Sequence, residues 1–119
     1  NIESVIVAIK AFDRPIVLLI GGYNKKSNFR LLLPHIKSNH VRAIISYGEA
    51  GGQINTALGD AVRLVREANL KSAVNKAQIL AKPGELVLLS PGCASFDEFS
   101  NFEERGNFFK KTVYELSHK

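Results

Sequence analysis

The chain has 119 residues, 45% of them hydrophobic and 23% charged, which is the composition of one ordinary soluble domain with a single core. Its longest apolar run is far shorter than the roughly 20 residues that cross a membrane, and its N-terminus lacks the pattern of a signal peptide, so we expect neither feature. The one cysteine, Cys93, cannot form an internal disulfide, and we therefore expect a protein of the reducing cytoplasm.

The net charge of +5 makes nucleic-acid binding an alternative that has to be weighed. The basic residues are dispersed, with only Lys25-Lys26 and Lys110-Lys111 adjacent, and no stripe of aromatic and basic residues connects them. An anionic small molecule explains a mild positive field equally well. We expect no nucleic acid and no membrane among the partners.

Helical and strand-like apolar spacings alternate along the chain. In chain order they predict a helix over residues 2–9, a strand over 16–20, a helix over 29–36, a strand over 41–47, a helix over 51–58, a strand over 61–65, a helix over 70–80, a strand over 86–89 and a last helix that uses Phe109, Val113 and Leu116. Short connections between alternating elements favour a parallel sheet with right-handed crossovers. The predicted fold class is therefore α/β, a Rossmann-like three-layer domain with a mostly parallel sheet flanked by helices.

Local details refine this prediction. The strand over 16–20 is apolar at every position, as in a strand covered on both faces, and we expect the strand over 86–89 to be buried as well. The strand over 61–65 is expected to be more exposed. Pro34 lies inside the second helical window, where it should kink or shorten the helix.

Polar and small residues follow two of the predicted strands. Gly21-Gly22-Tyr23-Asn24-Lys25 follows the first, where glycines allow a tight turn and a lysine can pair with a carboxylate or phosphate. An exposed lysine after a glycine-terminated strand is the alternative. The segment is neither a P-loop nor a dinucleotide fingerprint. Ser95 follows the strand over 86–89, where its hydroxyl can cap a helix and the neighbouring amides can hold an anion.

Other reactive groups have structural explanations. Asp97 and Glu98 fit the first turn of a helix, where acidic residues stabilise the helix dipole. Cys93 fits as a small packing residue, and Ser95 lacks the G-x-S-x-G elbow and histidine context of a nucleophile. The three histidines have no metal-ligand spacing, so no metal site is predicted.

The stretch SPGCASFDEFSNFEERG, residues 90–106, resembles the SPxxAS-x-D-x-F-x-x-F-x-x-RG segment of the Mur ligases that add D-glutamate to UDP-N-acetylmuramoyl-L-alanine in bacterial cell-wall synthesis. The segment LLIGGYNKKSNF resembles the second signature of that family, a strand followed by GG-x-x-K and a short loop to a phenylalanine. The similarity spans essentially the whole chain, although the middle agrees only in pattern. Two ordered motifs are much more specific than either alone.

The resemblance implies that residues 1–119 are most of the C-terminal, amino-acid-binding domain of an ATP-dependent ligase with three domains. It implies that Lys25 pairs with a carboxylate of D-glutamate and that Ser95 donates a hydrogen bond to a carboxylate, with the backbone at Phe96 and Phe102 helping to hold the same group. ATP, Mg²⁺ and UDP-N-acetylmuramoyl-L-alanine are expected to bind mainly through the upstream domains. The expected protein is a cytoplasmic monomer that acts in peptidoglycan synthesis and hence in cell shape and division.

The same resemblance implies a fragment. The family's threonine that contacts glutamate would lie immediately before Asn1, and the first strand of the domain, the ATP loop and the sugar site would also lie upstream. We therefore expect no catalytic residue in this chain and no activity from the chain alone. Tyr23-Asn24 departs from the acidic residue and glycine that the family often has there, which could alter the pocket.

Two alternatives stay open. The first is a sister ligase of the same superfamily that adds another amino acid, or adds glutamate to folate; the stretch SPGCASFDEF argues against it. The second is a non-catalytic Rossmann-like module that binds a nucleotide or a protein partner, against which the missing glycine fingerprint argues.

Overall fold

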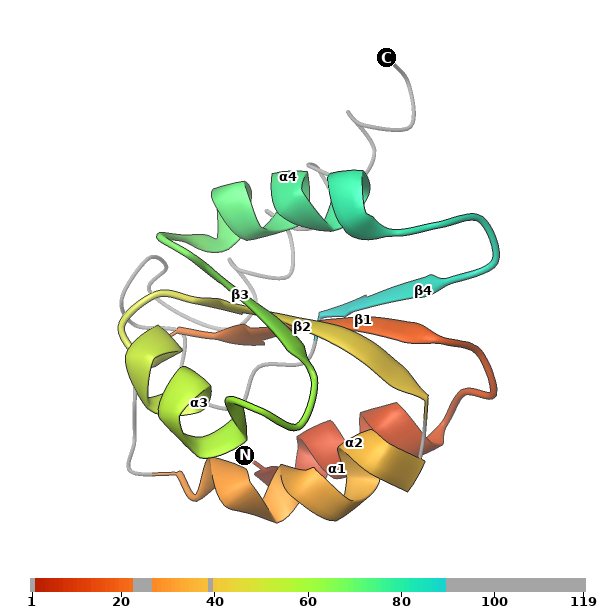
Figure 1. Cartoon of the computed structure of the whole chain (residues 1–119), viewed down its shortest axis with the longest axis horizontal. Coiled ribbons are helices and arrows are strands. Elements are labelled where there is room, and N and C mark those ends of the chain that lie inside the picture. The colour runs from red at the N-terminus through yellow and green to blue at the C-terminus, as the bar shows by residue number, and fades with distance from the viewer. Residues whose placement is uncertain (1, 23–26, 39, 90–119) are drawn as a thin grey trace.

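The computed structural model describes residues 2–22, 27–38 and 40–89, which form an α/β domain around a four-stranded sheet (Figure 1). The strands are all parallel and lie in the order β3-β2-β1-β4. In chain order the elements are α1 (Ile2–Lys10), β1 (Ile16–Gly21), the 3-10 helix η1 (Phe29–Leu32), α2 (Leu33–Ser38), β2 (Val41–Tyr47), α3 (Gly51–Leu58), β3 (Arg63–Glu67), α4 (Leu70–Leu80) and β4 (Leu86–Leu89). The predicted α/β class is confirmed.

Helices cover both faces of the sheet, which gives the domain three layers. Figure 1 shows α4 above the sheet and α1, α2 and α3 below it. Successive strand residues point to opposite faces, so Leu18 and Ile44 pack with α1, η1 and α3, whereas Val17 and Ile45 pack with α4. Burial on both faces explains why β1 is apolar at every position from Ile16 to Ile20.

Pro34 divides the second helical segment, as predicted. The chain forms a 3-10 turn over Phe29–Leu32, and α2 then begins at Leu33 with Pro34 in its first turn. Proline is tolerated there because the first N–H groups of an α-helix have no partner within the helix. Asn28 caps the start of this segment, since its side chain accepts a hydrogen bond from the Arg30 amide at 3.2 Å.

The two outer strands, β3 and β4, differ in detail from the predictions. β3 begins at Arg63 rather than at residue 61, because the Ala61 amide donates to the Leu58 carbonyl at 3.0 Å in the turn that ends α3. β3 is more exposed than the central strands, as predicted, since it lies at the edge of the sheet. β4 is only half-buried, contrary to the prediction, because β1 is the only strand that pairs with it in the described part of the chain.

The other described helices agree with their predicted ranges. α3 and α4 match the predicted residues, and α1 extends one residue beyond its range. A capping box starts α4: the Ser72 amide donates to the Asn69 side chain at 2.9 Å, and the Asn69 amide donates to the Ser72 hydroxyl at 3.3 Å. The last predicted helix, with Phe109, Val113 and Leu116, lies outside the described residues.

Candidate functional site

The strand order places a topological switch point between β1 and β4. From β1 the chain moves outward to β2 and then β3, and α4 carries it back over the sheet to β4 on the other side of β1 (Figure 1). Open α/β sheets bind ligands outside the carboxyl ends of the strands, at the point where the strand order reverses. The candidate site is therefore the carboxyl edge of the sheet around the ends of β1 and β4.

Close backbone packing shapes the end of β1. An added Cβ at Gly21 would lie 2.0 Å from the Tyr47 carbonyl oxygen, so no larger residue fits beside β2 without a backbone shift. Gly22 has a φ of 103°, a conformation that side chains strongly disfavour. These two positions require glycine for different reasons, one for space and one for backbone geometry.

Backbone hydrogen bonds join the carboxyl ends of the first three strands. The Gly22 amide donates to the Tyr47 carbonyl at 3.2 Å, and the Ala50 amide donates to the Gly22 carbonyl at 2.9 Å. The Gly48 amide donates to the Ala68 carbonyl at 3.3 Å, which links the ends of β2 and β3. This part of the edge is thus fixed before any ligand arrives.

The start of α3 forms hydrogen bonds to the residues on both sides of positions 23–26. The Ala50 amide, just before α3, bonds to the Gly22 carbonyl on one side. On the other side, the Gln53 side-chain amide donates to the Ser27 carbonyl at 3.1 Å. Residues 23–26 are therefore connected at both ends to one helix terminus, and Lys25 lies within that span of sequence.

A hydrogen bond between two polar side chains attaches the same helix to the sheet. The hydroxyl of Ser46, a fully buried residue of β2, donates to the Asn55 side-chain oxygen of α3 at 2.7 Å. Ser46, Gln53 and Asn55 were not among the residues predicted from the sequence. A polar residue within the apolar run of β2 was the available signal for the first of them.

The four predicted site residues, Lys25, Ser95, Phe96 and Phe102, lie outside the described residues. The strands that precede them are described. β1 and β4 lie side by side and parallel, with Leu19 opposite Leu89, so the chain leaves both strands at the same edge of the sheet. The segments with Lys25 and Ser95 thus start from neighbouring strand ends.

Comparisons with known proteins point to one family. Over 116 residues the chain is 41% identical to the UDP-N-acetylmuramoylalanine--D-glutamate ligase of Chlamydia felis, covering 98% of this chain and 27% of the relative. Ligases of the same name from Salinibacter ruber and Acidobacterium capsulatum are 40% and 42% identical, over 98% and 100% of this chain and 25% of each relative. No family model matches the chain.

The chain belongs to the Mur ligase family. It spans about a quarter of the length of the curated relatives that it matches. In this Mur ligase chain, the described residues contain no helix that could span a membrane. They also contain no group of three or more His, Cys, Asp or Glu side chains that could hold a metal ion.

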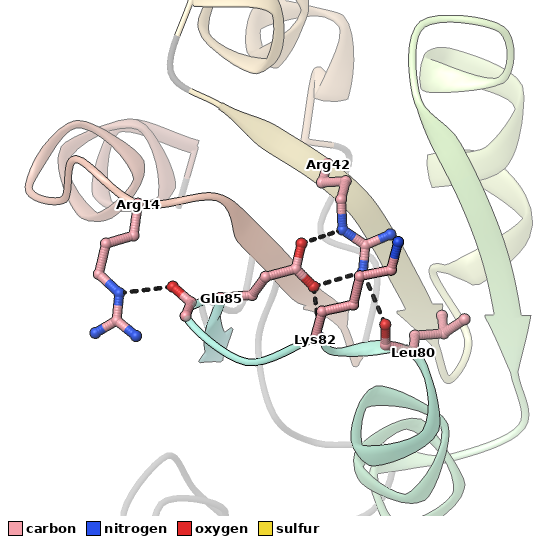
Figure 2. A network of polar contacts seen from close by, with 6 residues as sticks. Arg14, Arg42, Leu80, Lys82 and Glu85 are labelled. Carbon is pink, nitrogen blue, oxygen red and sulfur yellow. Dashed lines mark hydrogen bonds and ion pairs between the residues drawn. The ribbon is translucent and has the colours of Figure 1, made fainter.

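An ion-pair network lies at the opposite, amino edge of this Mur ligase sheet (Figure 2). The Arg42 guanidinium of β2 forms two hydrogen bonds with the Glu85 carboxylate, one of them 2.7 Å from Nη2 to Oε1. The same Nη2 donates to the Leu80 carbonyl at the end of α4, at 2.8 Å. The Lys82 amide donates to Glu85 Oε1 at 2.7 Å, and Arg14 Nε donates to the Gly84 carbonyl at 3.0 Å.

This network predicts a specific dependence of stability on pH. The hydrogen bond from Arg42, and after it the Lys82 amide, hold the pKa of the Glu85 carboxyl below its ordinary value of 4.5. A lowered pKa means that the unfolded chain takes up the proton first, so the stabilisation is complete above pH 4.5 and is lost as the pH falls through the pKa of the folded state. We expect Glu85→Gln to unfold with a weaker dependence on pH in this acidic range than the original protein.

Urea unfolding at a series of pH values measures this effect. Arg42→Ala should also weaken the dependence of the unfolding free energy on pH in the acidic range, because it removes the partner of Glu85. Arg63→Ala is the matched control, since it removes an exposed arginine from the same edge of the sheet and should leave the slope unchanged. Equal slopes for Glu85→Gln and the original protein would contradict the prediction.

Proposed function

We propose that the chain is the amino-acid-binding domain of an ATP-dependent ligase that adds D-glutamate to UDP-N-acetylmuramoyl-L-alanine in peptidoglycan precursor synthesis. The observation that carries this proposal is the parallel pairing of β1 and β4 at the switch point, because the segments with Lys25 and Ser95 follow these two strands. A dicarboxylic amino acid needs two anion-binding groups, and the two segments that follow these neighbouring strands can supply them. The names of the relatives support a ligase acting on this substrate pair.

In the proposed reaction, the carboxylate of UDP-N-acetylmuramoyl-L-alanine takes the terminal phosphoryl group of ATP, and ADP leaves. The neutral amine of D-glutamate then attacks the acyl carbon, the new amide bond forms as the nitrogen loses a proton, and inorganic phosphate leaves with the electrons of the broken C–O bond. The contribution of this domain is to bind and orient the amine, which converts a bimolecular attack into a positioned one. Closure of the domain onto the central ATP-binding domain brings the amine to the acyl phosphate.

Each predicted residue has a defined part in binding. Lys25 provides a positive charge for one carboxylate of D-glutamate, and the Ser95 hydroxyl donates to a carboxylate. The backbone at Phe96 and Phe102 completes the second anion site. Because the chain spans only about a quarter of the length of its relatives, we assign ATP and Mg²⁺ mainly to the parts of the ligase outside this chain and no activity to the chain alone.

Phosphate release by the full-length ligase tests the proposal. With ATP and UDP-N-acetylmuramoyl-L-alanine present, release should require D-glutamate and should not occur with L-glutamate. Lys25→Ala and Ser95→Ala should each raise the KM for D-glutamate at least about tenfold, because each removes a hydrogen bond to a charged group. Lys10→Ala is the matched control, since it removes a lysine from α1 without touching the carboxyl edge.

Three results would contradict the proposal. Release with neither isomer from a folded enzyme would favour a sister ligase, and a panel of other amino acids and folate would then identify the substrate. Unchanged KM values in Lys25→Ala and Ser95→Ala would remove these residues from the site. Saturable nucleotide binding by the isolated chain without any effect of glutamate would favour the non-catalytic module.

A further inference from the structure

β4 pairs with β1 along its whole described length, from Leu86 opposite Ile16 to Leu89 opposite Leu19, and its described hydrogen bonds outside this ladder lie at its amino end. At the carboxyl edge, the backbone hydrogen bonds described above connect β1, β2 and β3. The corresponding bonds of β4 in the described part of the chain lie at its start, where the Leu86 amide donates to the Pro15 carbonyl at 2.9 Å and Arg14 bonds to Gly84 (Figure 2). The contacts that position the start of β4 therefore also determine the position of its carboxyl end.

Arg42 holds both ends of the turn that leads into β4. Its guanidinium bonds to the Leu80 carbonyl, where α4 ends, and to the Glu85 carboxylate, directly before β4 begins (Figure 2). The Glu85 carboxylate also accepts the Lys82 amide within the same turn. Because the guanidinium is a planar fork with fixed donor directions, it sets the spacing between the end of α4 and the start of β4.

The apolar pattern of β4 does not specify its register. Leu86 and Leu88 pack on the face covered by α1 and α3, and Val87 and Leu89 pack on the α4 face. A one-residue slip against β1 would exchange these faces, but all four side chains are apolar, so either face would receive apolar side chains. The slip would also move the end of the strand by roughly 3.3 Å. The alternation of side chains therefore leaves the register to hydrogen bonds, and in the described part of the chain those outside the ladder lie at the start of the strand.

We propose that Arg42 is a positioning residue for amino-acid binding, acting through Glu85. The pair fixes the register of β4 against β1, and β4 in turn fixes the point from which the chain continues towards Ser95. This inference rests on the proposed function, because Ser95 is the group whose placement is at stake. Arg42 lies at the amino edge of the sheet and does not itself contact the substrate.

Kinetics of the full-length ligase test this role. Arg42→Ala should raise the KM for D-glutamate about tenfold and leave the KM for ATP unchanged. A general loss of stability would instead lower the active fraction, and hence kcat, without selecting one substrate. Arg42→Lys should raise the KM for D-glutamate by an intermediate factor, because lysine keeps the charge but lacks the planar guanidinium that forms two parallel hydrogen bonds. Arg63→Ala, which removes an exposed arginine from the same edge, should match the original enzyme.

A double-mutant cycle shows whether Arg42 acts through Glu85. Glu85→Ala should raise the KM for D-glutamate as Arg42→Ala does, and the double variant should be no worse than either single one. If Arg42→Ala does not fold, Glu85→Gln tests the same contact with little change in shape.

Two groups of results would overturn the inference. An unchanged KM for D-glutamate, a parallel rise in the KM for ATP, or additive effects in the cycle would overturn this inference alone. If the original enzyme released no phosphate in response to D-glutamate, the proposed function would fail and this inference with it.

Discussion

Replacing Gly21 with alanine should lower the free energy of unfolding by about 3 kcal/mol or more. The added Cβ would lie 2.0 Å from the Tyr47 carbonyl oxygen and 2.8 Å from the Tyr47 carbonyl carbon, so the contact is with backbone that cannot rotate away. Relief would require β1 and β2 to separate at the edge where the Gly22 and Tyr47 backbones bond to each other. The urea midpoint of Gly21→Ala measures this cost.

Gly52→Ala is the matched control for this prediction. Gly52 lies in the first turn of α3, and an added Cβ there would approach the flexible side chain of Arg66 no closer than 3.4 Å. Alanine is a better helix former than glycine, so this variant should be as stable as the original or more stable by up to about 1 kcal/mol. Equal stabilities for Gly21→Ala and Gly52→Ala would show that the carboxyl ends of β1 and β2 are not closely packed.

Truncating Leu18 to alanine should cost about 3 to 4 kcal/mol, whereas truncating Leu88 should cost only about 1 to 2 kcal/mol. The two leucines are directly opposite each other on adjacent strands and belong to the same cluster of apolar side chains. Leu18 is fully buried in β1, but Leu88 is half-buried in β4. The difference therefore measures burial with residue type, face and register held constant.

Chemical unfolding of both variants in one buffer gives this comparison. The slope of unfolding free energy against urea should stay the same in the two variants, which would show that the unfolded states are alike. A Leu88→Ala cost equal to that of Leu18→Ala would mean that β4 is as thoroughly covered as the central strand.

Much of the fold could be predicted because its core follows simple apolar patterns. The fully apolar run Ile16–Ile20 predicted a strand covered on both faces, and the structure buries all five residues. The predicted start of β3 was wrong because Ala61 and Val62 are apolar and precede the strand directly, while the Ala61 amide is already used by the turn after α3. The burial of β4 was overestimated because an apolar sequence does not tell an edge strand from a central one.

The sequence predicts where the candidate site lies more than how it is built. Glycines after β1 and the small residues after β4 indicated the carboxyl edge of the sheet, and the strand order reverses at this edge, which is where ligands bind in this class of fold. The contacts that Gln53 and Asn55 make were not predictable, because they join residues distant in sequence through geometry that only the packed helix provides. The roles of Lys25, Ser95, Phe96 and Phe102 stay predictions.

The late position of β4 in the chain has a consequence for biosynthesis. The contact between Arg14 and Gly84 joins residues separated by 70 positions, and β1 cannot gain its second neighbour until this part of the chain has been made. Parallel pairing over such a distance forms slowly. During that interval one edge of an entirely apolar strand is open to other nascent chains, which is a known route to aggregation. Premature termination before β4 would leave that edge permanently uncovered, so such products should require chaperones or be degraded.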